Sequence, residues 1–147
     1  MTNEGMDVLL VEDNEDDSTF LVRALKDAAP TAHIRVARDG VEAMALIFGA
    51  ECLENSPPLS RPKLVILDLK MPKIGGLEVL RRLKANPHSR TIPVVVLSSS
   101  LEKRDLADSY QLGANSYLVK PMDFDEFGEA VKMLGHYWLR FNQPPKP

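Results

Sequence analysis

Three carboxylates, a hydroxyl and an ammonium follow apolar runs of strand length in this chain. They are Glu12, Asp13, Asp68, Ser98 and Lys120. Because the carboxyl ends of parallel strands meet at one edge of an open α/β sheet, we expect these side chains to lie close together. Each residue alone is typical of a helix cap or a solvated surface charge. As a group they predict a site, since a carboxylate directly after four apolar residues, as at Asp68, is costly to bury unless it is paired or bound to a cation.

The chemistry of this group favours a divalent cation. Carboxylates at close range raise one another's pKa values, and a hard cation relieves that repulsion. Mg²⁺ prefers oxygen ligands and keeps several waters, so we expect Asp13 and Asp68 as direct ligands and Glu12 as a ligand through water. Lys120 would add a positive charge and Ser98 a hydroxyl. Such a site suits an incoming phosphoryl group, with the unprotonated Asp68 as its nucleophile.

The elements that must position these residues alternate between strands and helices. Short runs rich in β-branched residues predict buried parallel strands at Val8–Val11, His33–Ala37, Leu64–Leu67, Val94–Leu97 and Tyr117–Val119. Helical periodicity fills the gaps and is clearest from Phe124 to Trp138. Five such units predict an α/β fold, a doubly wound parallel sheet with helices on both faces. The acids Glu15, Asp16 and Asp17 suit the first turn of a helix, and we assign them only that role.

Composition places limits on the class of protein. A length of 147 residues, with 44% hydrophobic residues, fits a single globular domain. The net charge of −3 gives no drive toward nucleic acid or anionic membranes. The apolar runs are too short to span a bilayer, and no signal peptide is evident at the start. With a single cysteine, Cys52, these features lead us to expect a cytoplasmic protein.

The chain resembles the response-regulator receiver domains of two-component signalling. The matching segments occur in order over nearly the whole chain and are Val8–Asn14, Val65–Gly76, Pro93–Ser99 and Gly113–Pro121. The resemblance implies a flavodoxin-like strand order, 2-1-3-4-5, in one receiver domain over residues 1–147, with its core at about 6–134. It implies that Asp68 accepts a phosphoryl group from the phosphohistidine of a sensor histidine kinase. It also implies Mg²⁺ binding by Asp13, Asp68 and the backbone carbonyl of Lys70.

The same resemblance assigns a switching mechanism. Ser98 becomes the switch hydroxyl and Tyr117 the switch aromatic. A cis peptide bond between Lys120 and Pro121 is also implied. Phosphorylation would change the surface of the fourth helix, fifth strand and fifth helix, for protein–protein signalling or onward phosphorelay. The protein would then be no enzyme beyond its own phosphorylation and slow autodephosphorylation.

Other known types of acidic site fit the sequence less well. An EF-hand loop starting at Asp13 would need Gly and Glu where the chain has Ser18 and Ala24. A phosphatase of the haloacid-dehalogenase type would carry a second Asp two residues after its nucleophile, where Lys70 stands. A nucleotide binder would not place an acidic loop after its first strand. A receiver-shaped interaction module that never needs phosphate is the main alternative, and the intact acid set and Lys120 argue against it.

Two segments exceed a minimal receiver. One is the long connection Gly49–Lys63, and the other is the tail 135–147, with no output domain expected after it. The tail holds Tyr137, Trp138 and Phe141, which either complete the core or cover a two-fold partner. Together the two segments resemble the stand-alone receivers that serve bacterial phytochrome kinases and tend to be dimeric. We therefore expect a homodimer, a bacteriophytochrome kinase and an unidentified downstream protein target, without nucleic acid or membrane partners.

Overall fold

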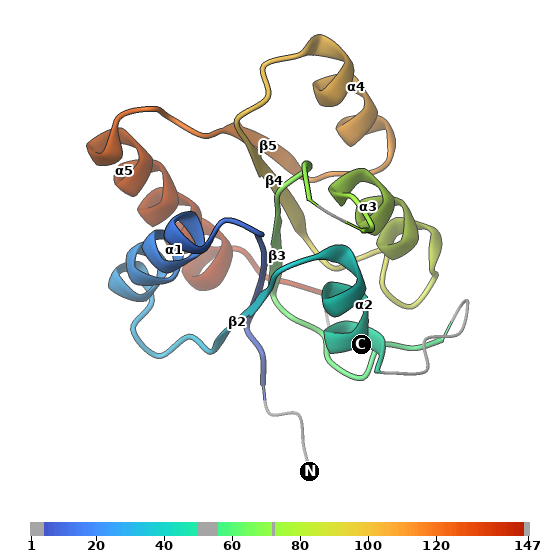
Figure 1. Ribbon diagram of the computed structural model, residues 1–147. Coiled ribbons are helices and arrows are strands. Elements are labelled where there is room, and N and C mark those ends of the chain that lie inside the picture. Colours follow the sequence, from blue (N-terminus) through green and yellow to red (C-terminus); the bar gives the residue numbers. More distant parts are fainter. Residues whose placement is uncertain (1–4, 50–55, 72, 146–147) are drawn as a thin grey trace.

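Five parallel strands form one sheet in the order β2-β1-β3-β4-β5 in the computed structural model (Figure 1). The structure describes residues 5–49, 56–71 and 73–145. The strands are β1 (Val8–Val11), β2 (Ile34–Ala37), β3 (Leu64–Leu67), β4 (Val94–Ser98) and β5 (Ser116–Val119). This arrangement confirms the doubly wound α/β sheet and the strand order that the resemblance implies.

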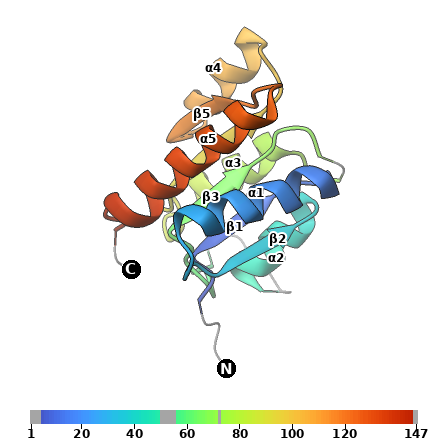
Figure 2. The same cartoon turned by 90° about the vertical axis from the view of Figure 1, so that its left-hand side faces the viewer.

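Helices cover both faces of the sheet. They are α1 (Glu15–Ala28), α2 (Gly40–Phe48), α3 (Gly76–Ala85), α4 (Lys103–Gln111) and α5 (Phe124–Gly135). Helices α1 and α5 lie side by side on one face (Figure 2), and α2 and α3 pack on the other. None of the described helices is long and apolar enough to cross a membrane.

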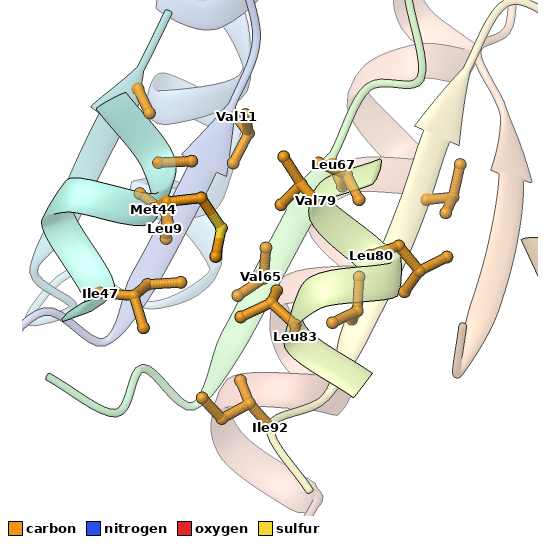
Figure 3. Packing of buried hydrophobic residues seen from close by; sticks show 14 of the residues in the cluster. Leu9, Val11, Met44, Ile47, Val65, Leu67, Val79, Leu80, Leu83 and Ile92 are labelled. Carbon is orange, nitrogen blue, oxygen red and sulfur yellow. The ribbon is translucent and has the colours of Figure 1, made fainter. Parts of the chain in front are cut away.

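The central strands are buried on both faces, which explains their uninterrupted apolar runs. Alternate side chains of β1 and β3 point to opposite layers: Leu9 and Val65 pack toward α2 and α3 (Figure 3), whereas Leu10 and Ile66 pack toward α1 and α5. All four are at most 1% exposed. Burial of each contributes about 1.5–3 kcal/mol, so the backbone that carries the candidate site is firmly held.

Asparagine or aspartate side chains cap the start of three helices, each of which follows the carboxyl end of a strand. Asn14 Oδ1 accepts the N–H of Asp17 at 2.9 Å and begins α1. Asp39 begins α2 in the same way, and Asp123 begins α5. Each cap satisfies an N–H group that would otherwise lack a partner, which fixes where the chain turns from strand to helix.

The loop between β3 and α3 requires a glycine. A Cβ atom on Gly76 would overlap the backbone of Asp68 and Leu69. The Gly76 N–H instead donates to the Leu69 carbonyl at 3.0 Å, so the loop folds closely back on the residue that ends the strand. The start of α3 is thereby packed directly against the backbone of the candidate nucleophile.

Part of the long connection, Gly49–Lys63, lies outside the described residues, and so does Cys52. Its second half is attached to the loop between α3 and β4. The guanidinium of Arg61 donates to Thr91 Oγ1 at 2.9 Å and to the carbonyl of His88. These bonds give the end of the connection a fixed place beside the sheet.

The tail aromatics differ in their burial. After α5 the chain continues in a π-helical segment, His136–Phe141. Trp138 packs against the apolar layer between the sheet and α1 and α5. Tyr137 and Phe141 are 52% and 70% exposed. One aromatic therefore extends the core, and two remain at the surface.

Candidate functional site

Three carboxylates meet at the carboxyl edge of the sheet. Strands β1 and β3 pair in register, with Val11 opposite Leu67, so the residues that follow them are neighbours. One oxygen each from Glu12, Asp13 and Asp68 lies within 4.8 Å of the others. Glu12 and Asp68 are buried, whereas Asp13 is exposed. The structure thus brings together the three acids that the sequence placed at one edge.

Lys120 reaches this group from the end of β5. Its Nζ lies 2.8 Å from Glu12 Oε1, 3.0 Å from Asp17 Oδ2 and 3.7 Å from Asp68 Oδ2. The backbone N–H of Lys120 donates to the Ser98 carbonyl at 2.8 Å, which anchors the base of the side chain on β4. The ammonium therefore lies between β1, α1 and β3.

Burial sets the electrostatics of the site. Burial, with a smaller effect from the Asp68 charge, raises the pKa of Glu12 to about 7, even though the bond from Lys120 acts in the opposite direction. Burial alone would lower the pKa of Lys120, but its hydrogen bond to Glu12 and the charge of Asp68 raise it overall. Lys120 therefore stays protonated at neutral pH, and Glu12 holds its proton more tightly than an exposed glutamate does.

The donor set fits a hard divalent cation. Three carboxylates supply only oxygen atoms, and a single ammonium leaves them with excess negative charge when all are ionised. The Lys70 N–H donates to Asp68 Oδ1 at 3.3 Å, so the backbone of Lys70 runs beside the carboxylate. The residues present thus match the requirements of Mg²⁺, and the assignment of each ligand stays a prediction.

The two predicted switch residues contact the same loop residue. Ser98 is 1% exposed at the end of β4, and its Oγ accepts the N–H of Ser100 at 3.1 Å. The Tyr117 hydroxyl donates to the carbonyl of Ser100 at 3.0 Å. The Ser100 hydroxyl in turn donates to Asp105 in the first turn of α4. A continuous set of hydrogen bonds therefore joins Ser98, Tyr117 and α4.

The expected cis peptide bond is wrong for this structure. The described residues contain no cis peptide bond, so Lys120 and Pro121 are joined in trans. The trans form of an X–Pro bond is favoured by about 0.5–1 kcal/mol in the absence of other constraints. Lys120 reaches Glu12 from the trans linkage, so its ion pair supplies no reason for the rarer isomer.

Asp17 contacts the site, although from the sequence we assign it only a helix-dipole role. Its Oδ2 atom accepts a hydrogen bond from Lys120 Nζ at 3.0 Å. Helical spacing offered the signal, because Asp17, Leu21, Ala24 and Ala28 lie on one stripe of α1, and the other three are buried. An acid in line with the apolar stripe faces the protein, unlike the neighbouring Asp16.

Comparison with known proteins gives a consistent family assignment. Residues 8–132 match the response regulator receiver domain. The probable methanogenesis regulatory protein FilR2 of Methanothrix harundinacea is 38% identical over 140 residues, which are 95% of this chain and 88% of that protein. Response regulator Rcp1 of Synechocystis is 39% identical over 132 residues, which are 90% of this chain and 88% of Rcp1.

Solved structures agree with the sequence comparison. The phosphorylated cyanobacterial phytochrome response regulator RcpA has a TM-score of 0.84 at 34% identity, covering 97% of this chain and 99% of RcpA. The Mn²⁺-bound form of Rcp1 has a TM-score of 0.83 at 38% identity, covering 95% of this chain and 98% of Rcp1. Both similarities extend over almost the whole chain.

Proposed function

The chain belongs to the response regulator receiver domain family, and we propose that Asp68 is its phosphoacceptor. Phosphoryl acceptance is typical of this family. The observation that carries the assignment is the burial of Asp68 at the end of the central strand, within ion-pair distance of Lys120 and beside Glu12 and Asp13. The donor would be the phosphohistidine of a sensor histidine kinase.

The transfer is a nucleophilic substitution at phosphorus. An Asp68 oxygen forms a bond to phosphorus while the bond from phosphorus to the histidine nitrogen breaks, and its electron pair stays on the imidazole. Lys120 neutralises charge on the phosphoryl oxygens, and Ser98 donates its hydroxyl to one of them. Asp13, Asp68 and the Lys70 carbonyl would hold Mg²⁺, with Glu12 acting through water. When bound, the cation supplies further neutralisation of the phosphoryl charge.

The switch would proceed through the loop after β4. If Ser98 turns toward the phosphoryl group, its bond from the Ser100 N–H is disturbed, and so is the loop that accepts the Tyr117 hydroxyl. Tyr117 then turns inward, and the α4–β5–α5 surface changes. The phosphoryl group favours this state because only this state makes the new hydrogen bonds.

The partner that we propose is a bacteriophytochrome histidine kinase in the cytoplasm. The support is the similarity to RcpA, a cyanobacterial phytochrome response regulator, over almost the whole of both chains. The signal would pass to a downstream protein or onward along a phosphorelay. Turnover would be limited to phosphorylation of Asp68 and its slow reversal.

We also propose that the chain forms a homodimer through a tail surface made of Tyr137, Trp138 and Phe141. Exposed aromatic side chains are enriched at protein interfaces, and Tyr137 and Phe141 are largely exposed. Trp138 packs against Tyr137 with ring centroids 5.1 Å apart in an edge-to-face arrangement. This contact connects the exposed ring of Tyr137 to Trp138, which itself packs against the core.

Beryllofluoride, which mimics a phosphoryl group, tests the assignment of Asp68. We expect the wild-type protein with Mg²⁺ and beryllofluoride to show protection from hydrogen exchange in α4, β5 and α5. Asp68→Asn should show no such change. An equal response of the wild type and the Asp68→Asn variant would refute the proposed site.

A further inference from the structure

The first turn of α1 contributes a carboxylate that contacts Lys120 from outside the acid cluster. Asp17 Oδ2 lies 3.0 Å from Lys120 Nζ, and the two side chains are 36% and 12% exposed. Asp16, its neighbour in the same turn, is exposed and has no ion-pair partner in the described part of the chain. The contact is therefore specific to position 17 and does not follow from a general excess of acids in this turn.

Hydrogen bonds close a ring that fixes Asp17 relative to Glu12. Glu12 Oε2 accepts the Asn14 N–H at 3.1 Å, and Asn14 Oδ1 accepts the Asp17 N–H at 2.9 Å. Lys120 completes the ring by donating to Glu12 Oε1 at 2.8 Å and to Asp17 Oδ2 at 3.0 Å. Because the helix cap is part of this ring, the fold itself places the two acceptors of the ammonium.

Both hydrogen bonds hold the ammonium on the side of β1 and α1. Asp68 Oδ2 is 3.7 Å from Lys120 Nζ, beyond hydrogen-bond distance. We expect a phosphoryl oxygen on Asp68 to attract the ammonium toward β3, which would lengthen one or both of its existing hydrogen bonds. The two bonds that could lengthen are those to Glu12 and Asp17.

The bond to Asp17 costs less to break. Glu12 is 2% exposed and has no second cationic partner among the described residues, so losing Lys120 would leave a buried carboxylate unpaired. Asp17 is more than a third exposed, so water can take the place of the ammonium. Movement of Lys120 toward Asp68 is therefore expected to release Asp17 and retain Glu12.

We propose that Asp17 is a positioning residue that holds Lys120 in its resting place and competes with the phosphoryl group for it. The inference rests on the proposed function, because it requires the phosphoryl group to be on Asp68. It goes further by assigning the resting position of Lys120, and hence part of the threshold for activation, to a residue outside the acid cluster. Loss of the Asp17 charge should therefore favour the activated state.

The test is the affinity for beryllofluoride at saturating Mg²⁺. Asp17→Asn should lower the dissociation constant by about 1.5- to fivefold, the range expected for a partly exposed ion pair. Asp17→Ser removes the same charge with a residue that also suits a first helical turn, and it should act in the same direction. Asp16→Asn is the matched control, with the same charge removed from the same turn, and should leave the constant unchanged.

A second readout reports directly on Lys120. In lysine-labelled protein, Asp17→Asn should shift the Lys120 side-chain resonance of the free form toward its beryllofluoride-bound position, and Asp16→Asn should not. Tighter binding and a shifted resonance in both Asp17 variants support the inference. Binding equal to that of Asp16→Asn, or weaker binding, overturns it while Asp68 keeps its role. A wild type that does not respond at all overturns the proposed function and this inference together.

Discussion

Lys120 pairs with three of the four carboxylates at the acidic edge, and its positive charge makes the burial of Glu12 and Asp68 tolerable. Its contacts come from β1, α1 and β3, three elements that are distant in sequence. Asp13, the fourth acid, is exposed and is left for a cation or for water. Lys120 thus balances the negative charges of Glu12, Asp17 and Asp68 within the protein, whereas the charge of Asp13 is balanced only by what binds there.

Replacement of Lys120 should separate phosphorylation from signalling. We expect Lys120→Ala to retain some Mg²⁺-dependent phosphorylation by acetyl phosphate, because the acid cluster remains. Without the ammonium to contact the phosphoryl group, hydrogen exchange in α4, β5 and α5 should no longer respond. Lys132→Ala, which removes a lysine of α5 outside the site, is the control. A normal response of Lys120→Ala would contradict the role given to this residue.

Glu12 should make the stability of the metal-free protein depend on pH. Burial raises its pKa from 4.5 to about 7, so the folded protein binds more protons than the unfolded chain between these values. The stability contribution of Glu12 is therefore fully present below pH 4.5 and is lost as the pH rises through about 7. Because of the titration of Glu12, we expect the free energy of unfolding in EDTA to fall by up to about 3 kcal/mol as the pH rises over this interval.

Urea unfolding at about pH 5 and about pH 8 measures this slope. Glu12→Gln should be less sensitive to pH than the wild type over the interval, because its amide does not titrate. Addition of Mg²⁺ should restore stability to the wild type at the higher pH. An identical slope in the wild type and Glu12→Gln would show that other groups cause the dependence.

At the scale of elements, the turn from β3 into α3 is the most constrained part of the site. A Cβ atom at Gly76 would overlap backbone, whereas one at Gly128 in α5 would make an ordinary contact with Phe20. Gly76→Ala should therefore destabilise the fold by about 2 kcal/mol or more and reduce phosphorylation of Asp68. Gly128→Ala should stabilise it by about 0.5–1 kcal/mol through helix propensity. Thermal unfolding of the two variants compares them, and equal effects would contradict this reading of the turn.

The sequence predicted the elements better than their orientation. Continuous apolar runs identified β1, β3 and β4 because burial on both faces removes the usual alternation. Periodicity also located α4, but its apolar side chains Leu106 and Tyr110 are exposed and its one buried residue is Ser109. Helical phase alone cannot distinguish a stripe that faces the sheet from one that faces a partner.

The sequence likewise predicted only part of the candidate site. Glu12, Asp13, Asp68 and Lys120 could be placed together because each follows a strand, and parallel strands end at one edge. Helical spacing indicated that Asp17 faces the protein interior, but its pairing with Lys120 became evident only from the packing of α1 against the sheet. The peptide isomer before Pro121 was expected only from the resemblance, and the structure has the trans form. Residue types alone identify neither the partner of Asp17 nor the isomer of this bond.

At the scale of the whole molecule, the acidic edge and the tail surface lie at opposite ends of α5. The helix begins after the loop that follows Lys120 and ends at Gly135, where the π-helical segment starts (Figure 1). The proposed chemistry thus lies at one end of the molecule and the proposed self-association at the other. The α4–β5–α5 surface runs between them and could transmit a change from one end to the other.

Light scattering tests the proposed tail surface. The wild-type protein should have the mass of a dimer, and the double variant Tyr137→Ser/Phe141→Ser should have the mass of a monomer. Val41→Ser removes an exposed apolar side chain of α2 and should leave the mass unchanged. A dimeric mass for the double variant would remove these two aromatics from the interface.

The most direct test of the central claim is to locate the phosphoryl group in the chain. After incubation with Mg²⁺ and radiolabelled acetyl phosphate, borohydride reduction should convert an aspartyl phosphate into a stable derivative that peptide mass mapping can identify. We predict that the modified residue is Asp68 and that Asp68→Asn abolishes the label. Stable labelling of Asp68→Asn, or modification mapped to another residue in the wild type, would contradict this account.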